Sequence, residues 1–233
     1  MFLKLPALLT LTFISALITY IAPLGLVPAG SAFIAKPLTT ILIILYAWPR
    51  GLGTPLLRRW VLTGLFFSLL GDVALMLPGG FVPGLLVFLL AHLAYLWAFT
   101  RVRKLASWPW SFVGYGLVAA VILAWLWSGI PAALHGPVAA YVICLSAMAA
   151  QAGVIGWRAR GDAAAGRRGA VLALGGLLFF CSDGCLAINR FGGPAGWADA
   201  LVLPTYWAAQ WCIASWLAPA ATAAAPSSPR LLT

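Results

Sequence analysis

The sequence predicts an all-α fold, that of a polytopic membrane protein with eight transmembrane helices. The chain of 233 residues is 64% hydrophobic and only 8% charged. A soluble domain of this size cannot bury so much apolar side chain. The apolar residues form runs of about 20, the length that an α-helix needs to cross a bilayer. Short segments rich in Pro and Gly separate these runs.

The eight helices are expected to follow one another without a connection long enough for a soluble domain, so residues 1–218 should form one transmembrane domain. The first run resembles a signal peptide, but its length and the lack of a small-residue cleavage site favour a retained helix. Residues 219–233 are rich in Ala, Pro and Ser, which predicts a disordered tail. The expected helices are 3–22, 31–49, 60–78, 81–100, 109–129, 137–157, 169–189 and 200–218.

The basic residues predict the topology. The gaps after the second, fourth and sixth helices are rich in Lys and Arg, whereas the gaps after the first, third and fifth contain neither. By the positive-inside rule, both termini are cytoplasmic. The net charge of +10 therefore reflects topology and not nucleic-acid binding, because the basic residues are not gathered on one patch. The composition, rich in Arg, Ala and Gly, is typical of a bacterial protein and suggests the inner (cell) membrane.

Two aspartates lie deep inside apolar runs. The chain has four acidic residues and no glutamate, and two of the four, Asp72 and Asp183, fall within predicted helices. A charged residue at a helix centre costs ~2.5–3.5 kcal/mol on insertion. Both helices are expected to run outward, and each carboxyl lies six residues from the outer end, which is ~9 Å. The sequence therefore predicts two carboxyls at similar depth in the outer half of the membrane.

A tyrosine follows each of these aspartates by 23 residues, Tyr95 after Asp72 and Tyr206 after Asp183. This spacing suggests an internal repeat, in which the third and fourth helices resemble the seventh and eighth. Chance similarity among helices rich in Leu, Ala and Phe is the alternative.

Other polar residues are predicted at the same depth, and one polar cavity that opens outward is the simplest arrangement. Each also has a structural alternative: the acids could join helices, the lysine could reach the membrane interface, and the histidine and tyrosines could be hydrogen-bonded core residues. With two histidines and cysteines scattered through apolar runs, no metal site is expected. The candidate residues are Lys36, Asp72, His92, Tyr95, Asp183, Tyr206 and Gln210, with Asn189 and Arg190 near the outer surface.

Five sequence blocks resemble the signature of the YhhN-like lysoplasmalogenases, and the similarity spans about residues 30–215. Their order and spacing across eight predicted helices also resemble that family. The blocks are Lys36-Pro37-Leu38-Thr39-Thr40, Gly71-Asp72-Val73-Ala74-Leu75-Met76, Ala91-His92-Leu93-Ala94-Tyr95, Ser182-Asp183-Gly184-Cys185-Leu186-Ala187 and Leu203-Pro204-Thr205-Tyr206-Trp207-Ala208-Ala209-Gln210.

The resemblance implies a membrane hydrolase that cleaves the vinyl ether bond of lysoplasmalogens to a fatty aldehyde and glycerophosphocholine or glycerophosphoethanolamine. It implies a lysophospholipid substrate, the bilayer as surroundings and no cofactor. Such cleavage starts with protonation of a carbon, and two nearby carboxyls can supply an acid and a negative charge. We therefore expect Asp72 and Asp183 to form this pair, with the proton on either one.

The remaining candidates have supporting roles in this hypothesis. His92, Tyr95 or Tyr206 would orient a carboxyl or the water. Lys36 and Arg190 suit a lipid phosphate, and Asn189 and Gln210 complete the expected substrate site. Three other functions fit the same residues: hydrolysis of an amide or ester lipid, proton-coupled transport of a small molecule, and lipid binding without catalysis.

Overall fold

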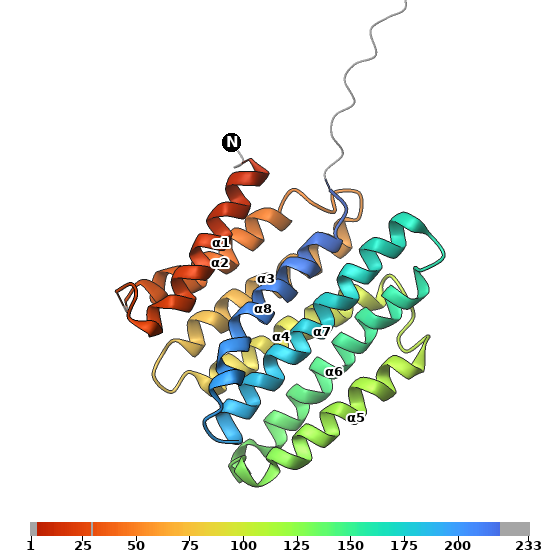
Figure 1. Ribbon diagram of the computed structural model, residues 1–233. Coiled ribbons are helices and arrows are strands. Elements are labelled where there is room, and N and C mark those ends of the chain that lie inside the picture. Colours follow the sequence, from red (N-terminus) through yellow and green to blue (C-terminus); the bar gives the residue numbers. More distant parts are fainter. Residues whose placement is uncertain (1–3, 29, 220–233) are drawn as a thin grey trace, which may run out of the picture.

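The computed structural model describes residues 4–28 and 30–219, and within these ranges the chain forms eight α-helices (Figure 1). The prediction of an all-α fold is confirmed. Most of the predicted tail, residues 220–233, lies outside the described residues. The helices are α1 (Leu5–Ile21), α2 (Ser31–Ala47), α3 (Pro55–Leu75), α4 (Phe81–Thr100), α5 (Pro109–Leu126), α6 (His135–Arg158), α7 (Ala163–Phe191) and α8 (Gly196–Trp216).

Four helices begin earlier than the sequence suggested, α6 and α8 by two and four residues and α3 and α7 by more. α3 starts at Pro55 instead of residue 60, because Pro is favourable in the first helical turn. Arg58 in that turn donates to the Trp48 carbonyl, with Nη2 to O at 2.7 Å, so the charged turn stays helical. α7 starts at Ala163 instead of residue 169, because the Asp162 carboxylate caps it by accepting from two backbone N–H groups.

Neighbouring helices along the chain run antiparallel and pack side by side (Figure 1). The pair α1 and α2 lies at one edge of the bundle and α5 at the other, while α3, α4, α6, α7 and α8 form its centre. The start of α1, the end of α8 and the basic connections after α2, α4 and α6 all lie at one end of the bundle. This arrangement agrees with the predicted alternation, whereas the side of the membrane on which that end lies stays a prediction.

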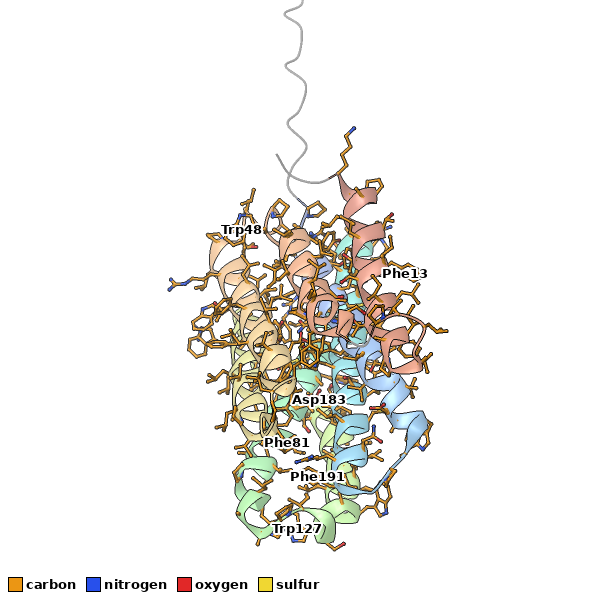
Figure 2. The ribbon with its side chains drawn as sticks, turned by 90° about the vertical axis from the view of Figure 1, so that its left-hand side faces the viewer. Phe13, Trp48, Phe81, Trp127, Asp183 and Phe191 are labelled. Atoms are coloured by element: carbon orange, nitrogen blue, oxygen red, sulfur yellow. The ribbon has the colours of Figure 1, made fainter. Side chains whose placement is uncertain are left out.

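The exterior of the bundle is apolar. Among the described residues, five helical segments are long and apolar enough to cross a membrane: α1 together with the turn that follows it (Leu5–Leu24), α4, α5, α6 and α7. α2 is a shorter apolar helix of 17 residues. Large hydrophobic side chains point away from the bundle, among them Phe13 at 69% exposure and Ile143 at 70%. Figure 2 shows Phe13 on the outside and Asp183 between the helices. The protein is therefore an integral membrane protein.

Small residues bring α6 and α7 close together. A Cβ atom added to Gly176 would lie 2.9 Å from the Ala152 Cβ and 3.1 Å from the Ala149 Cα. Close approach through small residues is typical of helix pairs in membranes, since packing replaces the hydrophobic effect there.

We expect Gly176→Val to lower the stability of the bundle by about 1–3 kcal/mol, because the new side chain meets the α6 backbone. Thermal unfolding of purified protein in detergent measures the change. Gly114→Val is the matched control, since a Cβ at Gly114 meets no atom within 4 Å. An equal melting temperature in the two variants would show that α6 and α7 do not approach closely at Gly176.

Candidate active site

A cavity of about 650 Å³ lies among α1, α2, α3, α4, α7 and α8. Its walls combine apolar side chains such as Leu75 and Phe88 with most of the polar residues that the sequence singled out. The polar side chains that line it are Thr19, Tyr20, Lys36, Asp72, Ser182, Asp183, Arg190, Asp199 and Tyr206. Both intramembrane aspartates therefore reach one cavity.

Asp72 is held by donors from two other helices. It is 1% exposed. Its Oδ2 accepts from the Thr40 hydroxyl at 2.6 Å and from the Tyr206 hydroxyl at 2.9 Å. Its Oδ1 lies 3.8 Å from the Lys36 Nζ. Thr40 and Lys36 are one turn apart on α2, so they reach the carboxylate together. Lys36 therefore forms an ion pair with Asp72 in addition to lining the cavity.

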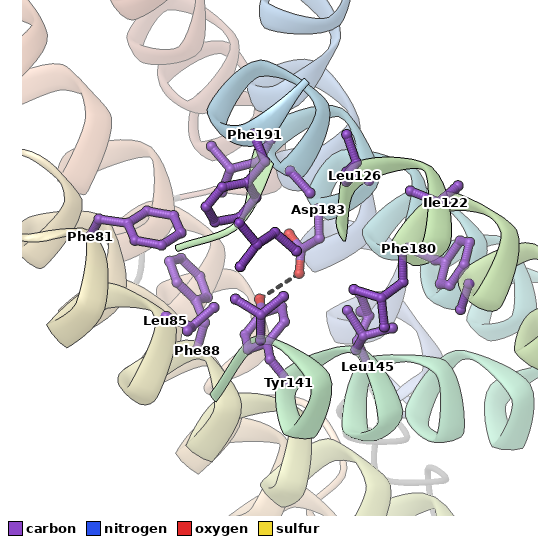
Figure 3. A pocket seen from close by; sticks show the side chains of 18 of the residues that line it. Phe81, Leu85, Phe88, Ile122, Leu126, Tyr141, Leu145, Phe180, Asp183 and Phe191 are labelled. Carbon is purple, nitrogen blue, oxygen red and sulfur yellow. Dashed lines mark hydrogen bonds between the residues drawn. The ribbon is translucent and has the colours of Figure 1, made fainter. Parts of the chain in front are cut away.

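Asp183 has different surroundings. The Tyr141 hydroxyl on α6 donates to its Oδ2 at 2.5 Å (Figure 3). The His92 Nε2 on α4 lies 3.7 Å from the same oxygen, which is beyond hydrogen-bonding distance. Among the described residues, Tyr141 is the one donor to this carboxyl, and no Lys or Arg forms an ion pair with it.

His92 is fully buried, and neither of its ring nitrogens has a hydrogen-bond partner among the described residues. Its ring lies edge-on to Phe179 and Tyr141, with centroid distances of 4.6 and 5.2 Å. An unpaired buried polar group is costly. The Asp183 carboxyl is the acidic group that lies within 4 Å of the imidazole.

Tyr95 and Gln210 are buried away from the cavity. The Tyr95 hydroxyl donates to the Gln210 Oε1 at 2.6 Å, and both residues are fully buried. Gly64 makes room for the tyrosine, since a Cβ there would overlap the ring. Neither Tyr95 nor Gln210 is among the described residues that line the cavity. The spacing of the suggested repeat links Tyr95 with Asp72 and Tyr206 with Asp183, but the Tyr95 hydroxyl donates to Gln210 and the Tyr206 hydroxyl donates to Asp72.

The two residues expected near the outer surface take different positions. Arg190 lines the cavity, and its guanidinium carbon lies 4.7 Å from the centre of the Phe81 ring. Asn189 instead supports the connection between α7 and α8. Its Nδ2 donates to the Asp199 Oδ1 at 3.2 Å, and its Oδ1 accepts from the Ala195 N–H at 3.2 Å.

A second, apolar pocket of about 80 Å³ adjoins this cavity among α3, α4, α5, α6 and α7 (Figure 3). Asp183 and Tyr141 are the polar side chains that line it, and they bond each other. The cavity and the apolar pocket share five lining residues, Leu75, Phe81, Phe88, Asp183 and Leu186. The Asp183 carboxyl therefore lies where a polar space meets an apolar one.

Sequence reasoning missed Tyr141 and Thr40. Thr40 belongs to the block that begins at Lys36, and its spacing of one helical turn was the available signal. Tyr141 stands in an apolar run with no other polar group at helical spacing to mark it. Within residues 4–28 and 30–219, no three His, Cys, Asp or Glu side chains come together as a metal site.

Comparison with known proteins shows which family and which named proteins the chain is similar to. The sequence model of the YhhN family matches residues 31–217. Lysoplasmalogenase TMEM86B of Homo sapiens is 33% identical over 77% of this chain and 72% of its own length. Lysoplasmalogenase TMEM86A of Homo sapiens is 32% identical over 80% of this chain and 78% of its own length. A lysoplasmalogenase of Mycobacterium bovis is 31% identical over 64% of this chain and 56% of its own length.

No solved structure matches the chain. The family match and the human relatives each cover most of it, and the match includes both intramembrane aspartates and all their side-chain partners. The family predicted from the sequence blocks is confirmed: the chain belongs to the YhhN family.

Proposed function

We propose that this protein is a lysoplasmalogenase, which hydrolyses the vinyl ether bond of a lysoplasmalogen to a fatty aldehyde and a glycerophospho-alcohol such as glycerophosphocholine or glycerophosphoethanolamine. The names of its relatives support the reaction. The observation that carries the proposal is the pair of aspartates on one intramembrane cavity, with unlike surroundings.

Asp183 is the acid in this proposal. A vinyl ether is protonated on the carbon farther from oxygen, which lies on the hydrocarbon side of the ether. The acid must therefore face the chain, while the rest of the site faces the glycerol. Asp183 lines both the polar cavity and the apolar pocket, whereas Asp72 lines the cavity only. Tyr141 holds one carboxyl oxygen of Asp183, which leaves the other available to the substrate.

Asp72 is the negative charge of the pair. Two hydroxyl donors and the Lys36 ammonium surround its carboxylate, and such partners favour the ionised form. Proton transfer to the substrate produces an oxocarbenium ion, which a fixed carboxylate across the cavity stabilises. The same carboxylate can accept a proton from the attacking water.

The steps balance without a cofactor. The proton of Asp183 forms a C–H bond with the alkene, whose electron pair leaves a cation shared by carbon and the ether oxygen. Water adds to that carbon and gives up a proton to Asp72, which yields a hemiacetal. The hemiacetal hydroxyl gives its proton to Asp183 as the C–O bond to glycerol breaks, and the glycerol oxygen takes the proton held by Asp72. One water is consumed, and the two carboxyls return to their starting states.

Arg190 is the candidate for the lipid phosphate. Of the two basic residues predicted for this role, Lys36 is paired with Asp72, whereas Arg190 lines the cavity beside the α7–α8 connection.

We also propose that the end of the cavity near Arg190 lies in the outer half of a bacterial inner membrane, with both termini cytoplasmic. The basic connections at the opposite end of the bundle support that orientation.

Hydrolysis of lysoplasmalogen by purified protein in deuterium oxide tests the function and its first step together. We expect one deuterium on the carbon next to the aldehyde carbonyl, provided that the aldehyde is reduced at once to stop exchange. In water labelled with oxygen-18, the glycerophospho-alcohol should contain no label, because the bond to the alkenyl carbon breaks. Mass spectrometry measures both. Label in the glycerophospho-alcohol, or release of a fatty acid, would contradict the proposal.

A further inference from the structure

Gly184 leaves an open space on the face of α7 that lines the apolar pocket. Phe180, Asp183, Gly184, Ala187 and Phe191 all line it, and their spacing puts them on one helical face. Gly184 lies in the middle of this face, next to the proposed acid. A Cβ atom built on it meets no atom within 4 Å. The missing side chain therefore contributes to the space in the pocket.

The chemistry of the pocket selects an apolar occupant. Apart from Asp183 and Tyr141, its walls are hydrocarbon or aromatic side chains and glycine. The two polar groups satisfy each other through the bond from the Tyr141 hydroxyl to the carboxyl. Water would find few partners beyond them, and an apolar cavity without partners stays dry. A hydrocarbon chain makes no hydrogen bonds, so it gives up none when it enters such a space.

The size of the pocket limits how much of a chain it holds. Its volume of about 80 Å³ corresponds to roughly three water-sized groups, at about 30 Å³ for each water in the liquid. A methylene group is of similar size, so the pocket accommodates the first few carbons of a chain and not a whole lipid tail. α5 forms one wall with Ala119, Ile122, Leu123 and Leu126, and it lies at the edge of the bundle (Figure 1).

We infer that this pocket is the subsite for the ether-proximal part of the hydrocarbon chain, and that Gly184 determines which chains fit. The inference rests on the proposed function, because the vinyl ether is what places the start of the chain beside Asp183. Chain carbons lie against Gly184 and Ala187 on α7 and against Leu145 on α6. The glycerol and headgroup remain in the polar cavity.

Gly184→Ala and Gly184→Leu test the inference on two substrates, a lysoplasmalogen with a hexadecenyl chain and an analogue with a vinyl group, which has no carbon beyond the double bond. Gly116→Leu is the matched control, since Gly116 is an exposed glycine of α5 whose Cβ would also meet no atom within 4 Å. We expect Gly184→Leu to lower kcat/KM for the long chain at least ~10-fold more than for the vinyl analogue, on the scale of steric discrimination in apolar pockets. Gly184→Ala should give a smaller shift, and Gly116→Leu none.

An unchanged ratio between the two substrates in active Gly184→Leu protein would overturn the chain subsite while leaving the vinyl ether reaction in place. If the wild-type protein cleaves neither substrate, the proposed function fails, and a binding experiment still decides the subsite. A lysophospholipid with a photoreactive diazirine near the start of its chain should then label α5, α6 or α7 beside the pocket. Labelling that is confined to the exterior of the bundle, or that is equal in the wild type and Gly184→Leu, would contradict the inference.

Discussion

Asp183→Asn is expected to lower kcat by at least ~100-fold, on the scale of lost general acid catalysis. Asparagine keeps the shape of the side chain and can still accept the hydrogen bond from Tyr141, but it has no proton to give to carbon. Steady-state release of aldehyde from lysoplasmalogen in detergent measures the loss. Substrate affinity should change much less, because the carboxyl acts in the transition state.

Asp162→Asn is the matched control for this substitution. Asp162 is an exposed acid that caps α7 beyond the membrane-spanning part of the bundle, and asparagine is also a favourable cap. It should retain full activity. An Asp183→Asn protein that unfolds at the wild-type temperature and also turns over at the wild-type rate would remove this residue from the chemistry.

The second large effect is expected for Asp72→Asn, which should also lower kcat at least ~100-fold because the negative charge facing the cation is gone. Here a loss of stability is expected as well. The side chain of Lys36 is only 15% exposed, and its charge would lose its carboxylate partner. Removing one member of a buried ion pair typically costs about 3–5 kcal/mol. Thermal unfolding and turnover, measured on the same preparation, separate the two effects.

The double variant Lys36→Met/Asp72→Asn distinguishes chemistry from folding. It removes both charges, so most of the stability should return, while activity should remain low. Recovery of activity together with stability would mean that Asp72 serves the fold and not the reaction.

The helices and their order could be predicted from the sequence because apolar runs and Pro or Gly breakers are local signals. The early starts of α3 and α7 were missed because charged turns at Arg58 and after Asp162 look like loops when only hydrophobicity is followed. Their stability depends on a carbonyl partner and a capping carboxylate, and the first of these comes from another segment of the chain.

The placement of Asp72 and Asp183 within helices was predictable, but the helix ends from which their depth was counted differ, since α3 ends at Leu75 and α7 at Phe191. Their partners were not predictable, because rotation of one helix against another is set by packing between segments far apart in sequence. Thr40 and Tyr206 reach Asp72 from α2 and α8, and Tyr141 reaches Asp183 from α6. Tyr95 was expected near the acids by its spacing, but its hydroxyl is taken by Gln210 on α8.

The junction of the two cavities at Asp183 bears on how the products leave. In the proposed reaction, one lipid of the bilayer is hydrolysed to a hydrophobic aldehyde and a water-soluble alcohol. The break occurs at the boundary between the apolar pocket and the polar cavity, so each fragment is already in surroundings that suit it. The aldehyde can pass toward the lipid beside α5, and the alcohol can leave past Arg190. Separate exits would keep the cleaved bond from reforming, since the two fragments never share a solvent.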